Sequence, residues 1–248
     1  MAGHSKWANI QHRKGRQDKI RGKLFTRIGK ELTIAARDGG NPEFNPKLRM
    51  AIDKAKAANM SKDVLERAIK KGTGELEGVE YVEMIYEGYG PAGVAFVVEI
   101  VTDNKNRSAA SVRSNFARND GNLGADGAVS WMFHRKGIII VDKGDMDTDD
   151  FMLQALDAGA EDISEENGKF EVVTEFSEFM AVKGNLEGQG IIVESAEITM
   201  IPENNVEITD EEMAKKVMKL YEALEDNEDV QNIYANFEIS DELMEKIG

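Results

Sequence analysis

The sequence predicts an α+β protein with three parts: an N-terminal three-helix domain, a middle α+β domain of the order ββαβ…αβ, and a ferredoxin-like βαββαβ domain inserted into the middle one. Three observations support this class. The 248 residues suffice for about two domains of ordinary size. The period of the apolar residues changes from helical to strand-like after Gly72. A composition of 41% apolar and 31% charged residues without cysteine excludes disordered and disulfide-stapled classes.

Three helices are predicted before Gly72. The first covers residues 20–38 and is stopped by two glycines. The second starts at Asn45, a favoured N-cap, followed by proline at N1, and the third starts after Ser61. Their apolar stripes supply the candidate core: Leu24, Phe25, Ile28, Leu32, Ala35, Leu48, Ile52, Ala55, Val64, Leu65, Ala68 and Ile69.

The middle domain opens with strand periodicity. Strands are expected at residues 81–87 and 94–102, joined by a glycine- and proline-rich turn. A helix at 106–118 and a strand at 128–133 follow, which gives ββαβ.

The next elements have the order of a split βαβ, ferredoxin-like sheet. An Asn167-Gly pair between two extended segments is a strong hairpin signal. The expected elements are, in order, strand 137–141, helix 148–158, strand 161–164, strand 169–174, helix 177–186 and strand 193–200.

A final helix at 210–225 and strand at 230–237 complete the chain. A lone helix and strand cannot bury their apolar faces, whereas the ββαβ unit lacks a second helix. We therefore expect this pair to join the middle domain. The resulting domains are residues 1–75, residues 76–135 plus 203–248, and residues 136–202.

The net charge of -15 conceals a strong asymmetry. Residues 1–72 contain 18 Lys and Arg against seven Asp and Glu, a net charge of +11, so the remainder carries -26. Such a division within one chain indicates nucleic-acid contact by the basic part.

The basic segment between positions 12 and 30 and the residues just before it supply the first candidate site. Arg and Lys would contact phosphates, whereas tryptophan, amide and histidine side chains could stack on bases or bind their edges. The alternative is a solvated charged face. The candidates are Lys6, Trp7, Asn9, Gln11, His12, Arg13, Lys14, Arg16, Lys19, Arg21, Lys23, Arg27 and Lys30.

A second candidate contact follows the strand that ends at Thr102. Polar and basic residues gather there in acidic surroundings, and the sequence leaves open whether they bind nucleic acid or form an ordinary turn and helix cap. These residues are Asn104, Lys105, Asn106, Arg107, Arg113 and Arg118.

No catalytic, metal or cofactor site is expected. The glycines at 88, 90 and 93 fit a dinucleotide fingerprint but lead into a strand, where that fingerprint needs a helix. The three histidines do not cluster at ligand spacing, and cysteine is absent. We therefore expect a protein that is not an enzyme and has no cofactor. A hydrolase is the least favoured alternative.

The apolar runs are far shorter than the roughly 20 residues that span a bilayer. The N-terminus also lacks the apolar segment of a secretory signal. The sequence thus predicts a cytoplasmic protein without membrane contact.

Seven ordered motifs resemble the YebC/PmpR family along essentially the whole chain. They are residues 3–14 (GHSKWANIQHRK), 23–26 (KLFT), 45–49 (NPKLR), 67–72 (RAIKKG), 86–91 (YEGYGP), 102–107 (TDNKNR) and 121–124 (GNLG). The resemblance implies the same three-domain α+β architecture. The family also includes a mitochondrial translational activator.

The resemblance implies either a DNA-binding transcriptional regulator or a ribosome-associated factor that binds ribosomal RNA or tRNA. By analogy, the motifs at residues 3–14 and 23–27 would form the nucleic-acid surface. We expect a monomer whose acidic domains face away or contact basic proteins. An adaptor that binds protein through its acidic surface, without nucleic acid, is the main alternative.

Overall fold

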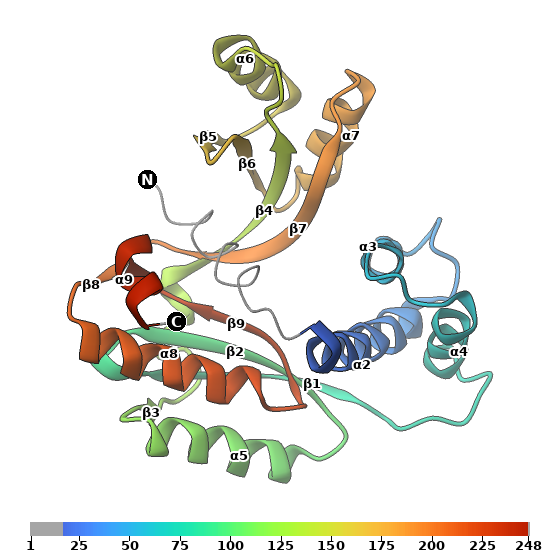
Figure 1. Ribbon diagram of the computed structural model, residues 1–248. Helices are drawn as coiled ribbons and strands as arrows, with labels where there is room; N and C mark the ends of the chain where they lie inside the picture. Colours follow the sequence, from blue (N-terminus) through green and yellow to red (C-terminus); the bar gives the residue numbers. More distant parts are fainter. Residues whose placement is uncertain (1–16, 248) are drawn as a thin grey trace.

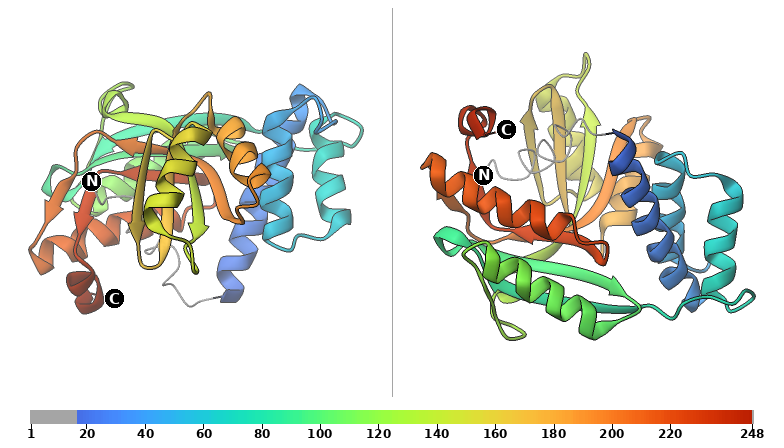
Figure 2. Two further views of the ribbon diagram at one scale, coloured as in Figure 1. Left: turned by 90° about the horizontal axis from the view of Figure 1, so that it is seen from above. Right: turned by 60° about the horizontal axis from the view of Figure 1, so that its bottom comes forward.

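The computed structural model describes the backbone of residues 17–247 and the side chains of residues 22–247. Figures 1 and 2 show a helical part, a middle sheet covered by two helices, and a second sheet that projects from it. The predicted fold class is confirmed. The limits assigned to the three domains stay a prediction.

The helical part consists of α2 (Gln17–Ala35), α3 (Pro46–Ala57) and α4 (Lys62–Gly72). One buried amide joins the first two: Asn45 accepts from the N–H of Leu48 at 3.0 Å and donates to the carbonyl of Ala35 at 2.6 Å. Gly72 allows α4 to approach α2, since a Cβ there would lie 2.2 Å from the carbonyl oxygen of Thr33. The buried core residues are Ile28, Leu32, Ala35, Ala36, Leu48, Ala51, Ala55, Met60 and Ala68.

The middle sheet has the strand order β3-β1-β2-β9. Its strands are β1 (Val82–Tyr89), β2 (Ala95–Thr102), β3 (Asn122–Leu123) and β9 (Val230–Ala235). Helices α5 (Lys105–Arg118) and α8 (Glu211–Glu225) cover one face, as Figure 2 shows. Because β9 pairs antiparallel with β2, the last αβ pair completes this sheet.

The second sheet has the order β5-β6-β4-β7, which is the ferredoxin-like arrangement. Its elements are β4 (Phe133–Asp142), α6 (Thr148–Ala158), β5 (Asp162–Glu166), β6 (Lys169–Glu175), α7 (Phe179–Gly188) and β7 (Val193–Pro202). Asn167 and Gly168 both have positive φ, 53° and 74°, as a tight hairpin turn requires. Phe151 and Phe170 stack at 4.1 Å between ring centroids under the two helices.

The long strands β4 and β7 connect the two sheets (Figure 1). Their paired ends, Phe133 and Pro202, reach the face of the middle sheet that α5 and α8 leave uncovered. Phe133 packs there with Ala95, Val97 and Val129. Within residues 17–247, no helix has the length and apolar character needed to cross a membrane.

The strand predicted at 128–133 is wrong. Ser130–Met132 forms a 3-10 turn, β4 begins only at Phe133, and the short β3 takes the edge position beside β1. The reason is the buried carboxylate of Glu87, which accepts the N–H groups of Gly127, Val129 and Ser130 that a strand would offer to a neighbour. Besides β3, three short elements were not predicted: β8 (Val206–Ile208), β10 (Phe237–Ile239) and α9 (Asp241–Ile247).

Candidate nucleic-acid interface

Most of the first candidate site precedes the part of the chain that the structure describes. Two further candidate cations, Lys19 and Arg21, lie in α2, and the structure describes only their backbone. The candidates outside the described residues are Lys6, Trp7, Asn9, Gln11, His12, Arg13, Lys14 and Arg16.

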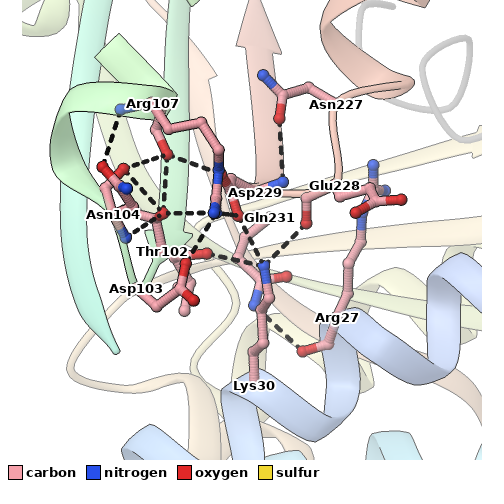
Figure 3. Close-up of polar contacts among 12 residues, drawn as sticks. Arg27, Lys30, Thr102, Asp103, Asn104, Arg107, Asn227, Glu228, Asp229 and Gln231 are labelled. Atoms are coloured by element: carbon pink, nitrogen blue, oxygen red, sulfur yellow. Dashed lines mark hydrogen bonds and ion pairs between the residues drawn. The ribbon is translucent and has the colours of Figure 1, made fainter. Parts of the chain in front are cut away.

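The candidate cations of α2 with described side chains contact the end of α8 and the segment that leads from it to β9. Figure 3 shows Arg27 and Lys30. The Nζ of Lys23 lies 2.5 Å from the carboxylate of Asp226, and Arg27 donates to the carbonyl of Glu225 at 2.7 Å. Gln231 returns a hydrogen bond to the carbonyl of Arg27 at 3.1 Å. Burial lowers the pKa of Arg27, although the charges of Glu225, Tyr221 and Asp226 oppose the shift.

Lys30 is the most buried of these cations, with 9% of the residue exposed. Its amine donates to the carbonyls of Val101 and Glu228, both at 2.9 Å, and to the carboxylate of Asp229 at 3.2 Å. An ammonium group has three donors, and three acceptors occupy them. Lys30 therefore lies at the junction between the helical part and the middle sheet, and its role in phosphate contact stays a prediction.

Asp229 is the centre of this junction and is only 7% exposed. Besides Lys30, it accepts a hydrogen bond from Ser108 at 2.7 Å and one from Arg107 at 2.9 Å. Burial alone would raise the pKa of Asp229, but the hydrogen bonds from Ser108, Arg107 and Lys30 outweigh it and hold the pKa below its ordinary value. The carboxylate thus remains charged and joins α2, α5 and β9.

The second candidate site divides into two groups. Asn104 caps α5 by accepting the N–H of Arg107 at 3.0 Å, and the Arg107 side chain contacts Asp103 and Asp229. For these two residues the structure shows the turn and cap, and Figure 3 displays both sets of contacts. The remaining four are exposed on α5: Lys105, Asn106, Arg113 and Arg118.

Sequence reasoning did not single out the exposed cations of α4. Arg67, Lys70 and Lys71 are spaced so that they share one face of that helix. The i, i+3, i+4 spacing could have identified them. They add positive charge to the helical part, beside Asp63 and Glu66 on the same helix.

A polar cavity of about 70 Å³ lies between Arg27, Glu197 and Tyr221, enough for about two water molecules. Among residues 17–247, no group of three or more His, Asp or Glu side chains is arranged to hold a metal ion.

Comparison with known protein families shows to which family the chain belongs. The model of the TACO1/YebC N-terminal domain matches residues 5–75, and the model of the second and third domains matches residues 81–237. The chain belongs to the TACO1/YebC family. The resemblance drawn from the sequence motifs is therefore confirmed.

Relatives within the TACO1/YebC family match over the whole chain. A probable transcriptional regulatory protein of Fusobacterium nucleatum is 66% identical, and the match covers 100% of both chains. A protein of the same description from Halothermothrix orenii is 56% identical over 100% of this chain and 99% of its own. The crystal structure of a conserved hypothetical protein from Aquifex aeolicus is similar, with 48% identity, a TM-score of 0.84, and coverage of 95% of this chain and 98% of that one.

Proposed function

We propose that this protein is a non-enzymatic, nucleic-acid-binding regulator of gene expression that contacts its target through the basic N-terminal part. The observation that carries the proposal is the charge division, +11 in residues 1–72 against -26 in the remainder. The names of the relatives, probable transcriptional regulatory proteins, support a regulator of this type.

The charge division favours one orientation of the molecule on a polyanion. The basic part, residues 1–72, attracts phosphate, whereas the acidic body, residues 73–248, repels it. Contacts are therefore expected in residues 6–21 and among the exposed cations of α5. Lys30 contributes to the junction instead, because its donors are occupied.

A charge-reversal variant tests this proposal. Arg13, Lys14, Arg16 and Lys19 are changed together to glutamate, and binding to duplex DNA and to a ribosomal RNA fragment is measured across a salt series. We expect loss of tight binding. On a duplex the dependence of affinity on salt should weaken by about 3 to 4 in the logarithmic slope, because each phosphate contact contributes about 0.9.

The matched control reverses four exposed lysines of the acidic body, which produces the same change in net charge. These are Lys215, Lys216, Lys219 and Lys246. We expect the control to retain most of the affinity. Equal losses in the two variants would contradict the proposal, because they would reflect net charge rather than a site.

DNA and RNA targets give different outcomes in further measurements. A transcriptional regulator protects a defined stretch of DNA and prefers it strongly over non-specific competitor. A translation factor co-sediments with large ribosomal subunits and loses this property in the quadruple variant. No recognition helix with helix-turn-helix geometry stands out in the sequence, which favours RNA.

A further inference from the structure

Two aromatic side chains of the middle domain are held at a common point and exposed to solvent. The hydroxyl of Tyr89 and the indole N–H of Trp131 both donate to the carbonyl oxygen of Ala128, each at 3.3 Å. Trp131 is 66% exposed and Tyr89 is 40% exposed. Ile85, on the same face of β1 as Tyr89, is 48% exposed. We call Ile85, Tyr89 and Trp131 the aromatic platform.

The loop that carries Trp131 is fixed by a buried carboxylate. Glu87 accepts the N–H groups of Gly127, Val129 and Ser130, all at 2.8 Å, and is 7% exposed. Burial alone would raise the pKa of Glu87, but these hydrogen bonds outweigh it and the pKa is lowered. The anchored Glu87 carboxylate therefore holds the loop in one conformation.

A fixed, exposed aromatic pair is well suited to bind a partner. Tryptophan and tyrosine are enriched among the residues that dominate binding energy at protein interfaces. Because the loop is already ordered by Glu87, binding would lose little further conformational entropy. Burial of Tyr89 and Trp131 by a partner would also remove apolar surface from water.

The charges near the aromatic platform select the partner. Residues 72–104 and 119–133, the segments that carry the three platform residues, contain no Lys, Arg or His. Of the cations that follow Trp131 in the chain, Lys136 pairs with Glu161 and Glu175, and Arg135 lies over the ring of Phe176. The charge of Arg113 on α5 acts on Tyr86.

Glu83 lies two residues before Ile85 on the same strand face, and Asp126 lies in the Trp131 loop. Glu99, directly opposite Ile85 on β2, already accepts hydrogen bonds from Asn232 and Tyr234. Phosphate would be repelled here, whereas a guanidinium or ammonium group would find both carboxylates and aromatic faces.

We propose that the aromatic platform is a docking site for an arginine- or lysine-containing segment of a basic protein. Cationic side chains of the segment would lie over Trp131 and Tyr89 and pair with Glu83 and Asp126, while its apolar atoms cover Ile85. This site is separate from the proposed nucleic-acid surface, so the protein would contact a basic protein and a polyanion through different domains.

The test uses the full chain with Trp7→Phe, which leaves Trp131 as the single tryptophan. The probes are a short synthetic peptide rich in arginine, the same peptide with every arginine replaced by glutamine, and a single-stranded oligonucleotide. Of the three probes, we expect only the arginine peptide to change the fluorescence emission of Trp131. A change caused by the oligonucleotide, or by the glutamine peptide equally, would overturn the proposal.

Variants separate this site from general attraction to the acidic body. Trp131→Ala should weaken binding of the arginine peptide about tenfold or more, as measured by calorimetry. Leu153→Ala, which removes a side chain that is 64% exposed on α6, should leave the affinity unchanged. Asp126→Asn should lower the affinity and weaken its salt dependence. Equal affinity of Trp131→Ala and the parent chain would refute the docking site, and an unchanged thermal midpoint shows that the variant is folded.

Discussion

The junction around Asp229 and the inserted sheet around Glu171 each bury a carboxylate, with opposite consequences. Asp229 is 7% exposed and receives hydrogen bonds from Lys30, Arg107 and Ser108. Glu171 is 6% exposed, and its Oε2 has no hydrogen-bond partner among the described residues. Burial, with the negative charges of Glu166 and Asp162 added, raises the pKa of Glu171 to about 7.

This difference separates the cations of the protein into two groups, those that pair with a buried carboxylate and those that do not. Where a buried carboxylate has recruited cations, as at Asp229, those cations belong to the fold. Lys30 and Arg107 therefore stabilise the junction. Lys105, Arg113 and Arg118 of α5 and the exposed cations of α4 neutralise no buried carboxylate among the described residues, which leaves them available to a ligand.

The largest effect is expected for Asp229→Ala. The substitution leaves the Lys30 amine buried beside two carbonyls without a counter-charge, and removal of one member of a buried ion pair costs about 3–5 kcal/mol. The free energy of unfolding should fall by this amount in urea titrations.

Asp226→Ala is the control for Asp229→Ala. Asp226 pairs with Lys23 through a side chain that is 75% exposed, so its loss should cost at most about 1 kcal/mol. Similar losses for Asp226→Ala and Asp229→Ala would show that burial of the pair at Asp229 is not the decisive property.

Glu171→Gln should act in the opposite direction. The pKa of Glu171 is above the ordinary value in the folded state, so the unfolded chain ionises first as pH rises. Stability is therefore lost between about pH 4.5 and pH 7 and stays reduced above it, by about 3 kcal/mol for a shift of this size. The glutamine variant should lack this loss, so its advantage over the parent should grow across that window.

Asp229 provides the internal contrast in the same pH series. Its pKa is lowered in the folded state, so its contribution is present above the unfolded pKa, near 4, and is lost as pH falls through the folded value. Urea titrations from pH 3 to pH 8 would follow both groups. A Glu171→Gln variant with the same pH dependence as the parent would contradict the assignment.

The sequence predicted the fold where local signals agreed with the global arrangement. Strand and helix order in the inserted domain followed from periodicity, and Asn167 with Gly168 fixed its central hairpin. The pairing of β9 with β2 followed from the need to bury apolar faces. The strand at 128–133 failed because Glu87, some 40 residues earlier in the chain, captures the backbone donors of that segment.

The candidate site was harder to predict because charge counts do not show partners. Lys30 appeared in the sequence as one more cation of a basic segment. Its partner Asp229 lies 199 positions away and in an acidic region. For Arg107, the sequence left open whether the side chain binds nucleic acid or belongs to an ordinary turn. The helix cap by Asn104 could be predicted from local spacing. The ion pair of Arg107 with Asp229 could not.

The smallest effect on stability is expected for the exposed cations of α5 that do not contact Asp229. Lys105→Ala, Arg113→Ala and Arg118→Ala together should leave the free energy of unfolding unchanged, because these side chains are exposed and have no partner in the buried network. If they contact phosphates, the logarithmic salt dependence of duplex binding should weaken by about 0.9 for each contact. Arg107→Ala, which removes a ligand of Asp229, should show the reverse pattern of lower stability and unchanged salt dependence. A triple variant that loses stability but keeps the parent's salt dependence would place these cations with the fold, and the contrast between occupied and available cations would fail.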